Sequence, residues 1–203
     1  MFAEELRNHD ETPVGDKIVV LRGLSWSDYQ RMLEVRGEAR MPRLAYLEGQ
    51  LEIMTPSPPH ESLKSRIGHL VAVWCLEKGV DFSAYGSWTL EKKEAERGIE
   101  PDECYVFGVE PEAVRPHLAV EVVWTSGGVR KLDIYQKLGV QEVWFWRRGR
   151  ITVHVLSGEQ YLEGATSGVL PGIDLAQLCG FLDRATTSQA IHEYRSALSR
   201  AKP

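Results

Sequence analysis

The segment His117-Leu118-Ala119-Val120-Glu121-Val122-Val123-Trp124 decides the fold class, because it is almost continuously apolar and leads into a helix and a second apolar run. Ser126-Gly127-Gly128 predicts a turn, Val129–Leu138 predicts a helix that ends at Gly139, and Glu142-Val143-Trp144-Phe145-Trp146 predicts the next strand. A strand that is apolar on both faces is typical of the centre of a sheet. A short helix between two such strands favours a parallel crossover, so the sequence predicts an α/β protein.

Hairpin signals on both sides of this unit add antiparallel strands. Leu44–Leu47 and Leu51–Met54 flank Glu48-Gly49-Gln50, whose glycine can take the positive φ of a tight turn. Arg148-Gly149-Arg150 predicts a similar turn into the strand Ile151–Val155. Parallel and antiparallel pairs together predict a mixed sheet.

Helices are expected to flank this sheet. Ser25 can cap a helix that runs to about residue 35, and residues 60–78 place apolar side chains at helical spacing on one stripe. Residues 185–200, capped by Thr186 or Thr187, predict a covering helix. Residues 81–88 and 104–107 read as strands, and the charged stretch Glu91–Arg97 reads as a surface loop.

Composition indicates a folded protein with one main domain. The chain has 203 residues, of which 43% are hydrophobic and 26% are charged, and its net charge is -5. These values exclude disorder and disfavour a wholesale polyanion-binding surface. We expect an N-terminal extension at 1–24, a domain at 25–180 and a C-terminal helix at 181–203. The three cysteines fit no metal or disulfide spacing and are expected to be reduced and mostly buried; without a signal peptide or membrane span, a cytoplasmic location is expected.

Glu121 is the most informative ionisable residue, because a carboxylate inside an apolar strand is costly to bury without a partner. An arginine or lysine could pair with it on a sheet face. Alternatively, Asp102, which precedes the strand at 104–107, could bring a second carboxylate to the same edge of a cleft. Two carboxylates with open positions suit Mg²⁺, or Mn²⁺, which prefer oxygen ligands.

Lys131 supplies a third group, in the first turn of the helix that follows the Glu121 strand. Although a lysine on a helix surface is usually solvated, this one can reach the same cleft. A metal held by two carboxylates can activate water, and a cation beside it can stabilise the charge that develops on the phosphate, so this arrangement suits hydrolysis of a phosphodiester.

These segments resemble a known family. Pro101-Asp102 followed by Glu121-Val122-Val123 looks like the PD-(D/E)xK phosphodiesterase motif without its last lysine. Together with the segments Tyr46–Pro58 and Lys131–Trp144, these motifs make the sequence similar to the Uma-two family of restriction-endonuclease-like proteins over roughly residues 25–180. The resemblance implies a restriction-endonuclease-like core, Mg²⁺ held by Asp102 and Glu121, and a catalytic lysine moved onto the helix as Lys131.

Two positions depart from the family pattern. Val123 stands where the wider superfamily has a strand lysine. A Glu-His pair is expected after the proline-rich loop, whereas this chain has Pro59-His60 with Glu61 behind it. His60 is a further candidate catalytic residue; the alternative is that it begins the helix and hydrogen-bonds the loop. The role of Glu61 stays open.

The sequence therefore predicts a metal-dependent phosphodiesterase that acts on DNA, with a homodimer as the simplest way to cut two strands. Six basic residues between 128 and 150 could contact phosphates or form an ordinary solvated face. One alternative is a catalytically inactive DNA-binding or partner-binding module on the same fold. Another is a hydrolase that acts on a nucleotide or another phosphoester.

Overall fold

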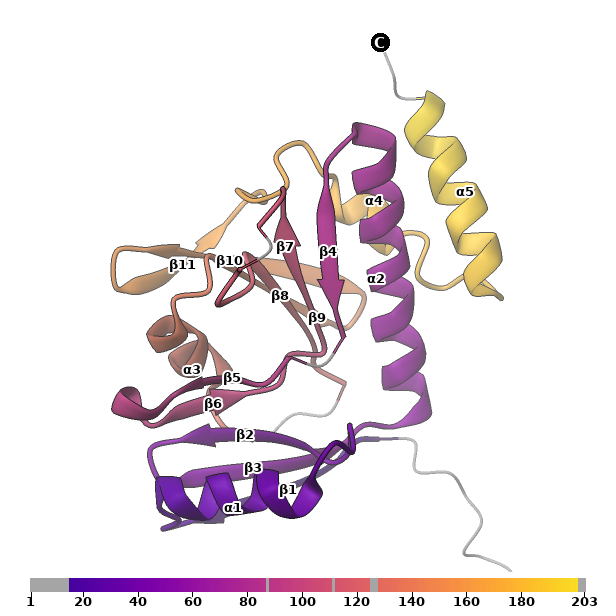
Figure 1. Cartoon of the computed structure of the whole chain (residues 1–203). Coiled ribbons are helices and arrows are strands. Elements are labelled where there is room, and N and C mark those ends of the chain that lie inside the picture. The colour runs from indigo at the N-terminus through magenta and orange to yellow at the C-terminus, as the bar shows by residue number, and fades with distance from the viewer. Residues whose placement is uncertain (1–14, 87, 111, 125–127, 201–203) are drawn as a thin grey trace, which may run out of the picture.

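The computed structural model describes residues 15–86, 88–110, 112–124 and 128–200, which form two β-sheets and flanking helices (Figure 1). The five-stranded sheet has the order β1-β3-β2-β6-β5, and the six-stranded sheet has the order β11-β10-β9-β8-β7-β4. The first comprises β1 (Lys17–Arg22), β2 (Arg43–Leu47), β3 (Gln50–Thr55), β5 (Leu90–Lys92) and β6 (Arg97–Ile99). The second comprises β4 (Phe82–Tyr85), β7 (Glu103–Phe107), β8 (Leu118–Val122), β9 (Glu142–Arg147), β10 (Arg150–Ser157) and β11 (Gln160–Gly164). The helices are α1 (Trp26–Arg36), α2 (Pro58–Lys78), α3 (Lys131–Leu138), α4 (Leu175–Cys179) and α5 (Thr187–Arg200).

The predicted crossover forms the middle of the six-stranded sheet. β8 and β9 pair in parallel and are joined through α3, whereas β9 with β10 and β7 with β8 pair antiparallel. All five residues of β8 are buried, as expected of a strand covered on both faces. The mixed α/β prediction is confirmed, while the predicted turn at Ser126-Gly127 lies outside the described residues.

Both predicted hairpins are confirmed. β2 and β3 pair antiparallel through Glu48 and Gly49, whose φ angles are 41° and 86°. β9 and β10 pair through Arg148 and Gly149 at 50° and 82°. Two successive residues with positive φ suit the right-handed twist of the flanking strands, so each loop needs only two residues.

The surface loop predicted at Glu91–Arg97 is wrong, because this stretch contributes β5 and β6. Both strands have three residues, too few for an alternating pattern to show in the sequence. β6 pairs with β2 and β5 closes that edge of the sheet. β1 and β11 were also not predicted, and each pairs at an edge of its sheet.

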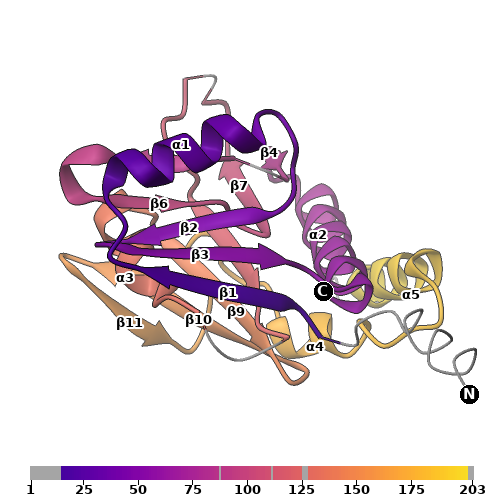
Figure 2. The same cartoon turned by 90° about the horizontal axis from the view of Figure 1, so that it is seen from below.

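The helices cover the two sheets in layers (Figures 1 and 2). α1 packs Tyr29 against Leu44, Tyr46 and Leu51 on the outer face of the five-stranded sheet. α2 and α4 cover the outer face of the six-stranded sheet, and α5 packs on α2 (Figure 1). α3 lies between the two sheets, so the polar groups that face this interior layer share one buried space.

Local signals account for where the helices begin. The Ser25 hydroxyl accepts a hydrogen bond from the Asp28 N–H at the start of α1, and Thr186 accepts one from the Gln189 N–H at 3.1 Å at the start of α5. α2 begins two residues earlier than predicted, because Ser57 caps it and proline is accepted in a first turn. Cys75 and Cys104 are buried, Cys179 is partly buried, and all three are free thiols, as expected.

Candidate functional site

Asp102 and Glu121 lie opposite each other at one end of the β7-β8 pair. Glu103 pairs with Val120, so Asp102 stands across from Glu121, one step beyond the paired residues. Residues opposite each other in an antiparallel pair project to the same face. The N–H of Val122 donates to Asp102 Oδ2 at 2.6 Å, and the two carboxylates are 1% and 0% exposed. The structure therefore brings the two predicted acids together in a buried layer.

α3 holds both oxygens of the Glu121 carboxylate. Lys131, the first residue of α3, places Nζ 2.6 Å from Glu121 Oε2. Tyr135, four residues later and hence on the same face of the helix, donates its hydroxyl to Glu121 Oε1. Sequence reasoning missed Tyr135, although its spacing from Lys131 was the available signal.

The protonation states of these partners follow from burial and charge. Burial disfavours the charged form of Lys131, but the carboxylates of Glu121 and Glu52 outweigh it, so the pKa of Lys131 is raised. Burial beside Glu121 also raises the pKa of the Tyr135 phenol well above its ordinary value. At neutral pH the site therefore contains an ammonium cation and a neutral phenol that both donate to Glu121.

The five-stranded sheet adds two charged side chains that sequence reasoning did not single out. Glu52 on β3 and Ala45 on β2 are paired positions, and Arg43 lies two residues from Ala45, so all three project toward α3 and the other sheet. Arg43 forms ion pairs with Asp102 and with Glu61, the latter at 2.7 Å. The only signal for Glu52 was an acidic residue inside an apolar strand.

Glu52 is 3% exposed and accepts a hydrogen bond from the Val129 N–H at 2.8 Å. Burial raises the pKa of its carboxyl, Lys131 opposes that shift and Glu121 adds to it. Gly128 has a φ of 95° and packs so tightly against this carboxylate that a Cβ would overlap it. A glycine is therefore required where the chain enters α3 beside Glu52.

His60 sits between two carboxylates at the start of α2. Its Nδ1 is 3.0 Å from Asp16 Oδ2 and its Nε2 is 3.1 Å from Asp102 Oδ1, and the ring is fully buried. Burial lowers the pKa of His60, opposed by Asp16 and reinforced by Arg43 and Lys131. The neutral ring has one N–H, so it can donate to only one of the two acids. Glu61 points to Arg43 and Lys64, the latter at 3.3 Å, and does not contact Asp102 or Glu121.

We expect the burial of His60 to make the protein less stable as the pH falls below about 6.5. Above that pH the ring is neutral in both states, whereas below it the unfolded chain takes up a proton that the folded chain resists. Stability is then lost by up to about 1.4 kcal/mol per pH unit until the lowered folded pKa is reached. His60→Gln should flatten this slope in urea unfolding followed at pH values from about 7.5 to 5.

His192→Gln is the matched control, because His192 is exposed and its removal should leave the slope unchanged. Burial raises the pKa of Glu52, so its contribution to stability changes with pH in the opposite direction. This contribution is present in both the wild type and His60→Gln, and it cancels when their slopes are compared. Equal slopes for His60→Gln and the wild type would contradict this account of the ring.

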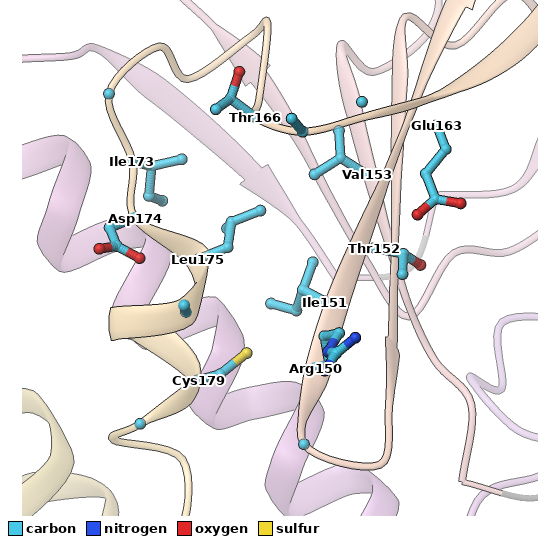
Figure 3. A pocket seen from close by; sticks show the side chains of 16 residues that line it. Arg150, Ile151, Thr152, Val153, Glu163, Thr166, Ile173, Asp174, Leu175 and Cys179 are labelled. Carbon is cyan, nitrogen blue, oxygen red and sulfur yellow. The ribbon is translucent and has the colours of Figure 1, made fainter.

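A small cavity of about 140 Å³ opens beside these groups and is lined by Asp16, Ile18, Glu52, Met54, Val122, Val123, Val129, Lys131, Phe145 and Arg147. A larger cavity of about 910 Å³ lies elsewhere, between β10, β11 and α4. Figure 3 shows Leu175 and Cys179 of α4 across from Ile151 of β10 in that larger cavity. None of the predicted site residues lines it, whereas Lys131 lines the smaller cavity and Asp102 and Glu121 lie beside that cavity, so the chemistry points to the smaller one.

The carboxylates in and beside the small cavity suit a hard divalent cation. Asp16 and Glu52 line the cavity, whereas Asp102 and Glu121 lie in the adjoining buried layer. These four carboxylates outnumber the three cations that the described residues place nearby, which are Arg43, Lys131 and Arg147. Asp102 Oδ1 lies 3.1 Å from His60 Nε2 and is ion-paired with the Arg43 guanidinium. Within that part of the chain, no three His, Cys, Asp or Glu side chains converge as a ready-made metal cluster. Mg²⁺ needs only one or two carboxylates and completes its shell with water and phosphate oxygens.

The family model "putative restriction endonuclease" (Uma2) matches residues 26–183, most of the chain. The chain belongs to the Uma2 family. The two-sheet α/β structure agrees with a restriction-endonuclease-like fold, so the predicted family and fold class are confirmed. No curated protein sequence matches the chain. Across the described part of this Uma2 protein, no helix is long and apolar enough to cross a membrane.

Proposed function

We propose that this Uma2 protein is a metal-dependent phosphodiesterase that hydrolyses DNA at the cavity between its two sheets. The observation that carries the proposal is the position of Asp102 across from Glu121, with Lys131 Nζ 2.6 Å from the Glu121 carboxylate. Membership of a family named for restriction endonucleases supports it. Asp102 and Glu121 would hold Mg²⁺ or Mn²⁺.

The bound metal would supply a water of lowered pKa and neutralise charge on the phosphate. The side chains of the protein would orient the metal ligands and supply a positive charge. Tyr135 and Lys131 fix the Glu121 carboxylate through its two oxygens. Lys131 stays protonated beside two acids, so its ammonium can stabilise negative charge that develops on a phosphate. It cannot act as a base in that state.

DNA as the substrate is supported by the basic residues near the cavity. Arg147 lines the cavity with Lys131, and Arg147, Arg148 and Arg150 are exposed around the β9-β10 turn. Exposed arginines bind phosphates and make binding dependent on salt. Cleavage of both strands would be simplest in a homodimer with two-fold symmetry.

A second candidate function is a catalytically inactive DNA-binding or partner-binding module. The ion pair between Arg43 and Asp102 favours it, because the guanidinium occupies the carboxylate that a metal would need. The apolar Val123 at the superfamily's lysine position favours it as well. Calcium distinguishes the two functions: it should support DNA binding without cleavage in a nuclease, whereas an inactive module should show no metal dependence.

The experiment is cleavage of supercoiled and single-stranded DNA in Mg²⁺ and in Mn²⁺ by the wild-type chain beside Glu121→Ala, purified identically. We expect nicking by the wild type and none by the variant, because Glu121 holds both the metal and Lys131. The variant also controls for contaminating nuclease. Equal cleavage by both proteins, or no cleavage by either over a broad pH range, would reject the proposed enzyme.

A further inference from the structure

An aromatic groove opens at the same end of the six-stranded sheet as the catalytic cavity but on the opposite face, because Trp146 lines the groove and its strand neighbour Phe145 lines the cavity. It has a volume of about 480 Å³ and is lined by the indoles of Trp124 and Trp146, by Arg66 and Leu63 of α2, and by Leu182. The indoles are stacked, with ring centroids 5.9 Å apart and planes at 8°. Trp146 is 9% exposed and Trp124 is 40% exposed. The exposed part of the Trp124 indole therefore gives the groove a flat π surface.

Two buried N–H donors of this groove lack an acceptor within the described part of the chain. They are Trp146 Nε1 and Arg66 Nε. Arg66 uses its Nη1 on the carbonyls of Leu182 and Arg184 at 2.5 and 2.7 Å, which fixes the guanidinium. Unpaired buried donors are rare in folded proteins, so this groove suits a flat ligand that carries carbonyl or ring-nitrogen acceptors.

The groove and the catalytic cavity are close to each other around the end of the sheet. Trp124 follows Glu121 by three residues, a reach of at most about 10 Å, and the intervening Val122 and Val123 line the cavity. On the other side, the groove residue Pro59 immediately precedes His60. A nucleic-acid strand that passes around this end of the sheet can therefore place one part in the groove and another in the cavity.

We propose that the groove binds an unpaired nucleobase of the strand whose phosphate lies in the catalytic cavity, so that the preferred substrate is single-stranded DNA or DNA with an extrahelical base. This inference rests on the proposed function and names its substrate class. Bases in a duplex have their faces covered by their neighbours, whereas an unpaired base can stack on Trp124. Its acceptors can take the hydrogens of Trp146 Nε1 and Arg66 Nε.

The test is binding, measured by fluorescence anisotropy without divalent metal, of a short labelled oligothymidylate and of an abasic sugar–phosphate strand of the same length. The two probes carry the same charge and differ only in their bases. The wild-type chain should bind the oligothymidylate more tightly than the abasic strand. Trp124→Ala should weaken oligothymidylate binding roughly 5- to 150-fold, the range expected for loss of one stacked base, and leave abasic binding unchanged.

Three variants separate stacking from other effects. Trp124→Phe keeps an aromatic face and should retain most of the binding. Trp146→Phe keeps an aromatic ring next to Trp124 but removes the N–H donor, and should weaken oligothymidylate binding by a smaller factor than Trp124→Ala. Trp88→Ala removes an indole that lines a different pocket and should bind as the wild type does. Thermal melts of all variants show whether each is folded.

Equal affinity of the wild type for the two probes, undiminished binding by Trp124→Ala, or no binding of oligothymidylate would overturn the inference. Cleavage is not measured, so the two proposals fail separately. Binding that depends on Trp124 in a chain that never cuts DNA would reject the nuclease and keep the base groove. Cleavage of DNA by a chain that binds both probes equally would keep the nuclease and reject the base groove.

Discussion

Replacing Lys131 by alanine is expected to reduce DNA cleavage by about 10³-fold, which corresponds to about 4 kcal/mol of transition-state stabilisation. The reason is that the Lys131 ammonium group lies 2.6 Å from Glu121 Oε2, so α3 places a positive charge at the proposed metal site. Mn²⁺ affinity, measured by calorimetry, should change only a few-fold, because both proposed ligands remain. In Glu121→Ala, by contrast, cleavage and Mn²⁺ binding should be lost together.

A lysine introduced at position 123 can test whether the loss of Lys131 is rescued from a neighbouring position. Val123 lines the same cavity as Lys131 and holds the position that carries the lysine in the superfamily the chain resembles. Val123→Lys in the Lys131→Ala background should therefore restore part of the cleavage, whereas Val123→Met should restore none. Retained cleavage by Lys131→Ala alone would remove the lysine from the mechanism. A lower melting temperature with unchanged cleavage would assign it to pairing with Glu121 only.

Replacing Glu142 by alanine is expected to destabilise the fold by about 3 kcal/mol or more, because several buried donors would lose their acceptor. Glu142 is fully buried and accepts hydrogen bonds from Trp144 Nε1 at 2.5 Å, Ser167 Oγ at 2.6 Å and the Gly168 N–H at 2.7 Å. It thereby ties the segment after β11 to the start of β9. A loss of this size should lower the melting temperature by about 6–12 °C in a domain of this length.

Glu142→Gln and Glu159→Ala complete the set. The glutamine keeps the volume of Glu142 but turns one acceptor into an amide donor that faces other donors, so an intermediate loss is expected. Glu159 is exposed, and its truncation should change the free energy of unfolding by less than about 0.5 kcal/mol. If Glu142→Ala melts within 2 °C or so of the Glu159 control, the hydrogen bonds of Glu142 are not what holds this segment.

Local patterns were sufficient for the central elements and for three site residues. The apolar run at β8 predicted a buried central strand, and the turn residues Glu48 and Gly49 predicted the β2-β3 hairpin, because backbone conformation in a tight turn depends on the residues in it. Glu121 could be singled out because it is a carboxylate inside an apolar strand. Asp102 stood out because it precedes a strand, and Lys131 because it begins the helix that follows the Glu121 strand. Their roles as metal ligands and catalyst stay predictions.

The remaining site groups come from the other sheet or from the next turn of α3. Arg43 and Glu52 lie on strands whose sequence predicts only an ordinary hairpin. Nothing near them in the sequence indicates that they face Asp102 and Lys131. Only the packing of one sheet over the other, with α3 between them, brings these charges within range of each other. The short strands β5 and β6 were missed for a related reason, since three residues carry no readable period.

The sequence of this chain thus specified its backbone turns, its central strands and the identity of the acids, since each depends on residues that are neighbours along the chain. The three-dimensional structure decided which charges share the buried layer, how Glu121 is held by Lys131 and Tyr135, and that the two indoles stack at the end of the sheet where the cavity opens. Those features depend on contacts between residues far apart in sequence, whose energies are set by burial and distance and not by spacing along the chain.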